Sequence, residues 1–263
     1  MDTKKEKKNI LSNGAVQTLL ASLFCIILGL VVGYVVLLVI NPQGAGRAIT
    51  AILQNFLYFP RTEVALEYFG STLAKTAPLL MCTLSVLFAY KVGLFNIGAS
   101  GQYAVGAGFA LYFGIHYGAP WWLCLLLAML GGAALGAIAG AFKAYLNVNE
   151  VIACIMLNWI SLYAVNTVLT EVKESGTTYT LPLRTNNPNA LIPHLGLQHL
   201  FADNRYVTIA IPLAVIFAIL VWVVLDKTKL GYELKATGLS INAAKYAGMR
   251  EKKNIILTMA ISG

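Results

Sequence analysis

The sequence predicts an all-α, polytopic membrane protein. Of its 263 residues, 58% are hydrophobic and only 11% are charged, whereas a soluble domain has roughly a quarter of its residues charged. Apolar runs of about 18 residues or more recur along the chain, and a helix needs that length to cross a bilayer. The runs are continuous rather than alternating, which argues against a transmembrane β-barrel.

The expected layout is a basic N-terminus, residues 1–14, followed by a transmembrane region over residues 15–263. The apolar run from Ala15 to Ile40 is too long for the core of a signal peptide, so it predicts an uncleaved anchor whose basic end is cytoplasmic. Its Gly29 and Gly33 form a GxxxG pair that would let a neighbouring helix approach closely. The expected spans lie at about 15–40, 72–92, 97–116, 120–142, 150–170 and 207–225, with an incomplete seventh at 254–263.

Residues 43–60 have apolar side chains at helical spacing and polar ones between them. This pattern fits an amphipathic helix on the outer interface, and equally a short re-entrant or packed helix. In the next span, Pro78 lies in the first turns, which predicts a kink or a late helix start.

The span at 120–142 carries Gly132, Gly136 and Gly140 at four-residue spacing. Such a stripe allows tight helix packing in lipid and is interpreted as structural. The sequence from Asn147 to Glu150 resembles a capping box with Asn147 as N-cap.

The stretch from Gly93 to Gln102 interrupts two apolar runs with three glycines and with Asn96, Ser100 and Gln102. Such a break at membrane depth is costly unless protein or water covers the freed backbone, and it indicates a substrate pathway. Asn158 centres a polar face on the span at 150–170, which fits either pathway lining or hydrogen bonding between helices.

The sequence also excludes several functions. It contains no phosphate-binding loop, no HExxH and no GxSxG, so neither ATP hydrolysis nor another catalytic activity is expected in this chain. The four cysteines lie in apolar spans without CxxC spacing, and His194 and His199 are interpreted as surface histidines of a long polar loop at 171–206, so no metal site or cofactor is expected. Its net charge of +8 arises from loops between spans, where charge sets topology rather than nucleic-acid binding.

The basic segment 226–253 is expected to lie between two spans on the cytoplasmic side. Ser240 can cap a short helix over 241–247, which Gly248 would end. Small residues such as Ala243 and Ala244 would let a partner surface approach the backbone. The pattern fits a docking element, and equally an ordinary basic loop against anionic lipid. With the N-terminus inside, 13 basic residues fall on the inner side and six on the outer side, as the positive-inside rule requires.

Four separated motifs then resemble one family of transport proteins. They are Ala77-Pro78-Leu79-Leu80, the stretch from Gly93 to Gln102, the segment from Val148 to Asn158, and the stretch from Gly231 to Met249. In this order and spacing they are similar to the permeases of nucleoside and simple-sugar ABC importers, closest to purine nucleoside (guanosine) permeases. Ser100 stands where members of that family usually carry glutamate.

The resemblance implies a permease in a bacterial cell membrane that pairs with a second permease subunit. Two separate ATPase subunits would bind ATP and grip the short cytoplasmic helices, and a substrate-binding lipoprotein would dock outside on 43–70 and 171–206. It implies ATPase coupling through Gly231, Gly238, Ala243, Ala244, Tyr246 and Gly248. Asn96, Ser100, Gln102 and Asn158 are the candidates for the substrate pathway, where they would pair with a neutral polar substrate.

Other interpretations stay open. A secondary transporter or channel would use the Gly93–Gln102 break as its own binding site and would work without an ATPase. The last apolar run stops after nine residues, which is too short to cross a bilayer. A further open interpretation is therefore a truncated, non-functional permease fragment. The substrate could be a nucleoside, a sugar or a flavin.

Overall fold

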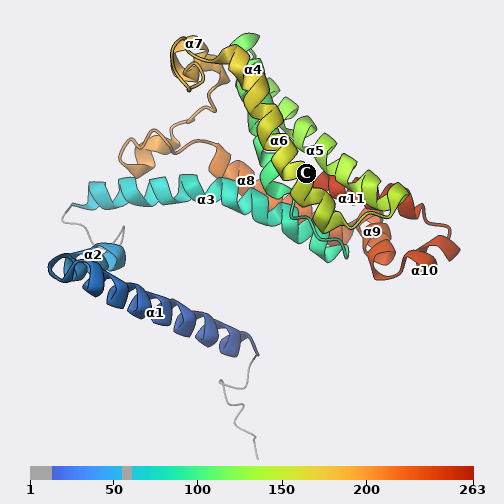
Figure 1. The fold of residues 1–263 in the computed structure, drawn as a ribbon, viewed down its shortest axis with the longest axis horizontal. Coiled ribbons are helices and arrows are strands. Elements are labelled where there is room, and N and C mark those ends of the chain that lie inside the picture. Colours follow the sequence, from blue (N-terminus) through green and yellow to red (C-terminus); the bar gives the residue numbers. More distant parts are fainter. Residues whose placement is uncertain (1–13, 55–60) are drawn as a thin grey trace, which may run out of the picture. The chain divides into compact units, whose positions relative to one another are not determined.

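The computed structural model describes residues 14–54 and 61–263. These residues form helices and loops, with no β-strand among them (Figure 1). This confirms the all-α expectation. The chain divides into two compact units, residues 1–68 and 69–263. The predicted basic N-terminus lies almost wholly outside the described residues, as do residues 55–60 of the predicted amphipathic segment.

The first unit contains helices α1 (Gly14–Ile40) and α2 (Pro42–Gln54). Asn41 separates them, and its side-chain oxygen accepts a hydrogen bond of 3.0 Å from the backbone N–H of Gly44. This is N-cap geometry, and Pro42 occupies the first helical position, where its missing N–H is tolerated. The helical spacing noted after residue 43 therefore does form a helix, while its place at an interface stays a prediction.

Helix α3 (Thr62–Lys91) begins ten residues before the predicted start of the second span. Pro78 consequently lies deep within the helix rather than in its first turns, so the expected late start is wrong. Glu63 and Glu67 lower the hydropathy of the first turns of α3. A helix start predicted from the apolar run alone is therefore too late.

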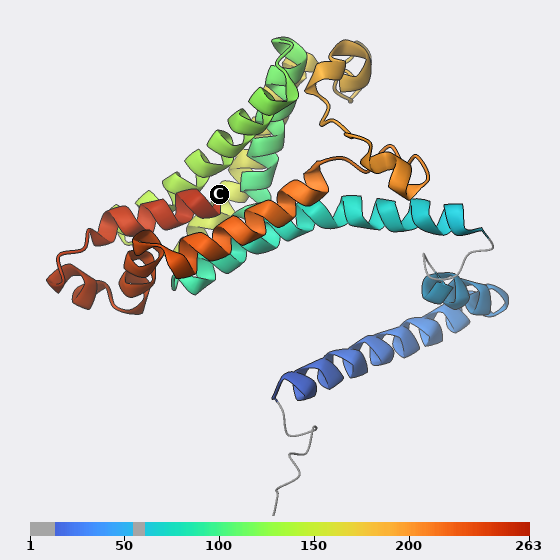
Figure 2. The ribbon, with the colours of Figure 1, turned by 180° about the vertical axis from the view of Figure 1, so that it is seen from behind.

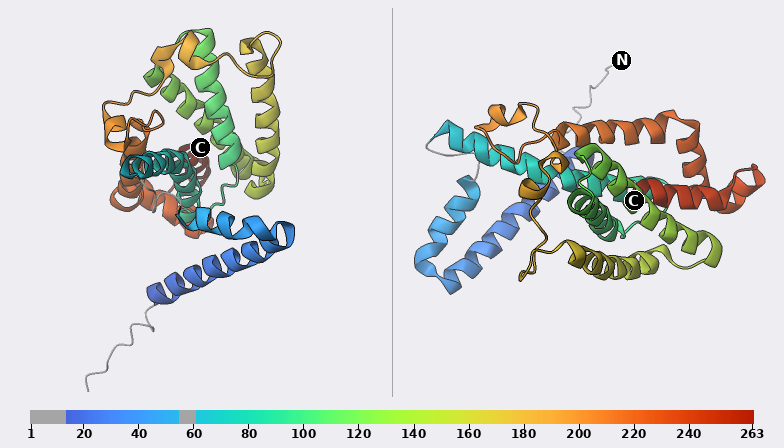
Figure 3. Two further views of the ribbon diagram at one scale, coloured as in Figure 1. Left: turned by 90° about the vertical axis from the view of Figure 1, so that its left-hand side faces the viewer. Right: turned by 90° about the horizontal axis from the view of Figure 1, so that it is seen from above.

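In the second unit, α4 (Ala99–His116), α5 (Trp121–Leu146) and α6 (Glu150–Leu169) form a bundle, and α11 (Glu251–Ser262) packs along α5 (Figures 1 and 3). The glycine stripe makes this last contact. A Cβ added to Gly140 would lie 2.9 Å from the Cα of Ile256, and one added to Gly136 would collide with the carbonyl of Met259. The structural interpretation of the stripe is confirmed.

The turn between α5 and α6 corrects the predicted capping box. Asn147 adopts a left-handed conformation with φ +52° and ends α5. Asn149 is the N-cap of α6, and its side chain accepts a 2.9 Å hydrogen bond from the N–H of Val151. Asparagine suits both positions, since it tolerates the left-handed region and also caps helices. Glu150 is then free to pair with Lys143 at 2.8 Å.

The long loop after α6 contains four short helices and is tied to the bundle. These are η3 (Thr170–Val172), α7 (Leu183–Asn186), η4 (Pro188–Ala190) and η5 (Leu197–Phe201). Buried Asn187 donates 2.9 Å hydrogen bonds from its amide nitrogen to the carbonyls of Gly114 and Ala119. The predicted polar loop is therefore anchored at its centre to the turn that joins α4 and α5.

The chain returns through α8 (Ala210–Lys227), which lies beside α3 in Figure 2, and then turns through α9 (Lys229–Leu239) and α10 (Ile241–Tyr246) into α11. Phe88 and Val92 from the end of α3 form one apolar cluster with Leu225 of α8 and Leu234 of α9. Burial of these side chains fixes α9 against the end of α3.

Five helices in the described part of the chain are long and apolar enough to cross a membrane, namely α1, α3, α5, α6 with η3, and α8. Helix α4, predicted as a span over 97–116, is not one of them. Its 18 residues would rise about 27 Å, close to the thickness of the hydrocarbon core. Its buried glycines and Gln102 give it less apolar character than α5 and α6 have.

Candidate functional site

The break between α3 and α4 is an ordered helix end followed by a short irregular segment. Gly93 has φ +80°, and the N–H groups of Gly93 and Leu94 donate to the carbonyls of Tyr90 and Ala89. These two bonds are those of a Schellman motif, which requires the left-handed conformation that glycine adopts at least cost. The motif directs the chain away from α3 and carries Asn96 into the bundle.

Asn96 is fully buried and lies at the centre of a hydrogen-bonded polar cluster. Its amide nitrogen is 2.9 Å from the side-chain oxygen of Gln102, 3.1 Å from the hydroxyl of Ser85 and 2.6 Å from that of Ser262. These partners belong to α4, α3 and α11. We call Asn96, Gln102, Ser85 and Ser262 the Asn96 cluster. Satisfied polar groups in a helical bundle orient the helices that contribute them.

The other side of the Asn96 amide extends the cluster to a fourth helix. Its oxygen accepts from the N–H of Gly98 at 2.9 Å and from the thiol of Cys154 on α6 at 3.7 Å. The hydroxyl of Ser262 in turn donates a 2.8 Å hydrogen bond to the carbonyl of Ser85, which links α11 to α3. One asparagine thus joins α3, α4, α6 and α11.

Asn158 makes the second link between the break and α6. Its amide nitrogen donates to the carbonyl of Ile97 at 3.1 Å, and its oxygen accepts from the N–H of Gly101 at 2.9 Å. Gly101 has no room for a side chain here, since an added Cβ would lie 2.8 Å from the Cα of Asn158. The amide therefore satisfies the backbone that the break sets free, as a non-helical segment at membrane depth requires.

The four predicted pathway residues thus differ in their surroundings. Asn96 and Gln102 are buried, Asn158 is half-buried and paired with backbone, and Ser100 is exposed. In this conformation the amide groups of Asn96 and Asn158 are already hydrogen-bonded within the chain. A pathway role for the four stays a prediction. Ser85 and Ser262 of the cluster, and Cys154 beside it, were not predicted, because each is a single small residue in a remote apolar run.

The predicted coupling residues lie on α9 and α10, apart from Gly248, which follows the end of α10. Gly231 and Gly238 are seven residues apart on α9. Each lies where two backbone segments are in contact and leave no room for a side chain. A Cβ on Gly231 would collide with the carbonyls of Val224 and Leu225, and one on Gly238 would collide with the carbonyl of Val92. Gly93 faces this same contact, because its own added Cβ would lie 2.9 Å from the carbonyl oxygen of Gly238. The backbone of helix α9 therefore packs directly against the residues that begin the break.

Helix α10 forms as the sequence predicts. The hydroxyl of Ser240 accepts a 3.3 Å hydrogen bond from the N–H of Ala243 at its start. Gly248, with φ +79°, ends it in a second Schellman motif, in which Met249 donates to the carbonyl of Ala244.

The side chains of α10 divide into an exposed and a buried set. Tyr246 is 93% exposed and Ala243 is exposed, while Ala244 is only 3% exposed. An approaching partner would therefore meet Ala243 and Tyr246 first. Ala244 is buried and is not part of this exposed face, since a six-residue sequence pattern does not define which face of the helix packs inward. Its role in ATPase coupling stays a prediction.

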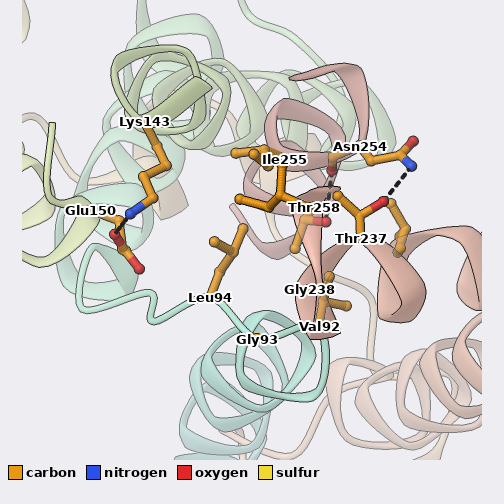
Figure 4. Close-up of a pocket in the computed structure, with 12 residues that line it drawn as sticks. Val92, Gly93, Leu94, Lys143, Glu150, Thr237, Gly238, Asn254, Ile255 and Thr258 are labelled. Atoms are coloured by element: carbon orange, nitrogen blue, oxygen red, sulfur yellow. Dashed lines mark hydrogen bonds and ion pairs between the residues drawn. The ribbon is translucent and has the colours of Figure 1, made fainter. Parts of the chain in front are cut away.

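A cavity of about 140 Å³ lies between the start of the break, α9, α11 and the turn that joins α5 and α6 (Figure 4). The ion pair of Lys143 and Glu150 faces it from one side. On the other side the amide of Asn254 donates to the hydroxyl of Thr237 at 2.8 Å. The cavity adjoins the Gly93–Gly238 contact, so it leaves space beside the junction of α9 with the break.

Comparison with known proteins identifies the class of this chain. A family model described as branched-chain amino acid transport system / permease component matches residues 68–263. The chain belongs to this family. The match covers the break, the Asn96 cluster, α9 and α10, and the chain is thus a membrane permease component of a transport system.

Two ABC transporter permease proteins are among the relatives that are similar to this chain. A guanosine ABC transporter permease protein of Bacillus subtilis (strain 168) is 33% identical over 249 residues, which are 93% of this chain and 68% of the relative. A nucleoside ABC transporter permease protein of Lactococcus lactis subsp. cremoris (strain MG1363) is 32% identical over 206 residues, 74% of this chain and 55% of the relative. This permease chain therefore spans between half and about two thirds of the length of these relatives. No solved structure matches it.

Proposed function

We propose that this chain is the membrane-spanning permease subunit of an ATP-driven importer for nucleosides. Membership of the permease family and the similarity to guanosine and nucleoside ABC permeases support the class and the substrate. ATP binding and hydrolysis take place on a separate ATPase subunit. A second permease subunit completes the pathway, and an extracytoplasmic lipoprotein delivers the substrate.

The observation that carries this proposal is the direct backbone contact between Gly238 and the Val92–Gly93 segment. The ATPase grips the exposed residues of α10, and α10 is joined to α9 through Ser240 alone. A displacement of α9 must move the Schellman motif at Gly93, because no side chain lies between the two backbones to absorb it. Asn96 follows three residues later, so the displacement reaches the Asn96 cluster.

Transport then requires the cluster to open. Asn96, Gln102 and Asn158 would exchange their internal hydrogen bonds for bonds to the hydroxyls and ring nitrogens of a nucleoside, and the exposed Ser100 would add its hydroxyl. Hydrogen bonds between membrane helices contribute roughly 0.6 kcal/mol each on average. The cluster is therefore strong enough to order the closed state and weak enough for an ATP-driven motion to open it.

The long loop supplies a surface for the lipoprotein. Asn187 anchors the loop near the α4–α5 turn, and the amide of Asn204 donates a 2.7 Å hydrogen bond to Ser71 at the other end. Between these anchors, Leu195 and Leu200 are exposed. An anchored loop with exposed apolar side chains loses little conformational entropy on docking. The excess of basic residues on the other side supports a cytoplasmic N-terminus and an outward-facing loop.

Uptake by membrane vesicles tests the proposal. Vesicles that contain the permease, its partner permease, the lipoprotein and the ATPase should accumulate labelled guanosine only when ATP is supplied on the ATPase side. An ATPase that lacks its catalytic carboxylate should abolish uptake. Equal uptake by vesicles without any ATPase would favour the secondary transporter or channel instead, and labelled sugar and riboflavin identify the substrate if guanosine is not taken up.

A further inference from the structure

We propose that a concavity between the starts of α9 and α11 binds the phosphate group of an anionic phospholipid. The concavity has a volume of about 540 Å³ and is lined by residues from 229–233, 247–250 and 253–257. It lies outside the Asn96 cluster. The proposed transport function does not require it.

The charges of the lining favour a phosphate. Lys229, Arg250 and Lys253 are cationic, and Glu233 is the one carboxylate among the residues that line the concavity. The ammonium of Lys229 lies 3.7 Å from the Glu233 carboxylate. Arg250 and Lys253 have no ion-pair partner within residues 14–54 and 61–263. A guanidinium and an ammonium that line the same concavity can bind phosphate oxygens through charge-assisted hydrogen bonds.

The remaining lining distinguishes a lipid from a free anion. Leu230, Met249 and Leu257 give the concavity an apolar wall, and Leu257 lies one helical turn beyond Lys253 along α11. A lining that combines cations with apolar side chains matches a phosphate that continues into a glycerol and acyl chains. An inorganic phosphate would gain nothing from the apolar wall.

Two cation–aromatic pairs indicate that the concavity lies at the level of lipid headgroups. The ammonium of Lys252 lies 5.1 Å from the centre of the Tyr145 ring, and that of Lys227 lies 5.4 Å from the Trp222 ring. Tyrosine and tryptophan concentrate at the membrane–water interface, and basic pockets between helices there bind anionic headgroups. A lipid held in this position would join the first turn of α9 to the first turn of α11, which are the two ends of the coupling segment.

The test compares phospholipids on the purified, full chain in a neutral detergent. Phosphatidylglycerol should raise the unfolding temperature and stay bound in native mass spectrometry, whereas phosphatidylcholine at the same concentration should do neither. Inorganic phosphate is the third ligand. If it stabilises the protein as much as phosphatidylglycerol does, the site takes a free anion and the lipid proposal is overturned.

Variants locate the site. Arg250→Gln combined with Lys253→Gln should bind phosphatidylglycerol roughly tenfold more weakly, and Glu233→Gln should bind it more tightly because the repelling carboxylate is gone. The matched control, Lys227→Gln with Lys245→Gln, removes the same charge from outside the concavity and should bind like the wild type. An equal loss in both double variants would mean diffuse surface attraction and no site. If Arg250→Gln with Lys253→Gln binds lipid normally but no longer co-purifies with the ATPase, the concavity belongs to the ATPase interface and the proposal is contradicted.

Discussion

The side-chain nitrogen of Asn96 donates a hydrogen bond of 2.6 Å to the hydroxyl of Ser262, a residue 166 positions later in the chain. The bond joins the break after α3 to the last turn of α11. Because α11 also packs its backbone against the glycine stripe of α5, this contact links the central irregular segment to the most closely packed helix pair of the unit.

Replacement of Asn96 should therefore destabilise the bundle as a whole. Asn96→Ala leaves the buried amide group of Gln102 without its hydrogen-bond partner, at a cost of about 1–3 kcal/mol. The unfolding temperature in detergent should fall clearly, and Asn166→Ala, which removes an exposed amide from α6, should leave it nearly unchanged. If Asn96→Ala unfolds at the wild-type temperature, the cluster does not order the bundle.

A double-mutant cycle between Asn96→Ala and Ser262→Ala isolates this one bond. We expect a coupling energy of roughly 0.6 kcal/mol, and at most about 1.7 kcal/mol, the range that such bonds reach between membrane helices. Strict additivity of the two changes would mean that the 2.6 Å bond contributes nothing to stability.

Much of this arrangement could be predicted from the sequence because it depends on local signals. Long apolar runs predict the helices, and the glycine stripe predicts close packing without naming the partner helix. Ser240 and Gly248 predict both ends of α10, since capping and the left-handed conformation depend on single residues. These features need no knowledge of what lies across the bundle.

The rest depends on contacts between distant segments. Asn96 and Gln102 are recognisable as costly polar residues, but the pairing with Ser85 and Ser262 arises only when α3 and α11 meet. Likewise, the burial of Ala244 depends on packing that a six-residue helix does not encode. The assignment of Asn147 as the N-cap was wrong because Asn147 and Asn149 are both asparagines and only the backbone conformation distinguishes them.

The glycine stripe makes a prediction that helix propensity alone would reverse. Gly136→Ala should raise helix propensity by roughly 1 kcal/mol, yet its Cβ would collide with the Met259 carbonyl and separate α5 from α11. Overpacking of this kind typically costs about 1–3 kcal/mol, so the net effect should be a lower unfolding temperature.

Gly46→Ala on α2 is the matched control, since nothing lies within 4 Å of its added Cβ. It should be neutral or slightly stabilising. A Gly136→Ala variant that is as stable as Gly46→Ala would show that α11 does not pack on the stripe in the membrane.

The two alanines of α10 should respond differently to the same substitution. Ala243→Glu places a charge on the exposed face, so it should prevent co-purification of the ATPase while the unfolding temperature stays unchanged. Ala244→Glu buries a charge, which should destabilise the segment before any partner binds. Loss of ATPase binding by Ala244→Glu alone, with Ala243→Glu behaving as wild type, would contradict docking on the exposed face.

Ser161 offers a test in the stabilising direction. Its hydroxyl is the one buried side-chain polar atom without a hydrogen-bond partner in the described part of the chain. Ser161→Ala removes a polar group that is already unpaired, so stability should stay constant or rise by up to about 1 kcal/mol. Ser262→Ala makes the same chemical change at a bonded hydroxyl and should lower stability. A clear loss with Ser161→Ala would mean that its hydroxyl has a partner in the membrane.

The contact of Gly238 with Val92 and Gly93 should decide whether ATP hydrolysis and transport stay coupled. Gly238→Ala places a methyl group onto the Val92 carbonyl and pushes α9 away from the break. The exposed face of α10 is untouched, so the ATPase should still bind and hydrolyse ATP. Uptake of labelled nucleoside should nevertheless fall by an order of magnitude or more, because the displacement no longer reaches Asn96.

Ala236→Ser on the same helix adds one atom away from this contact and serves as the control. Uptake and hydrolysis that decline in parallel would point to a simple folding defect, and normal uptake by Gly238→Ala would exclude this route of coupling.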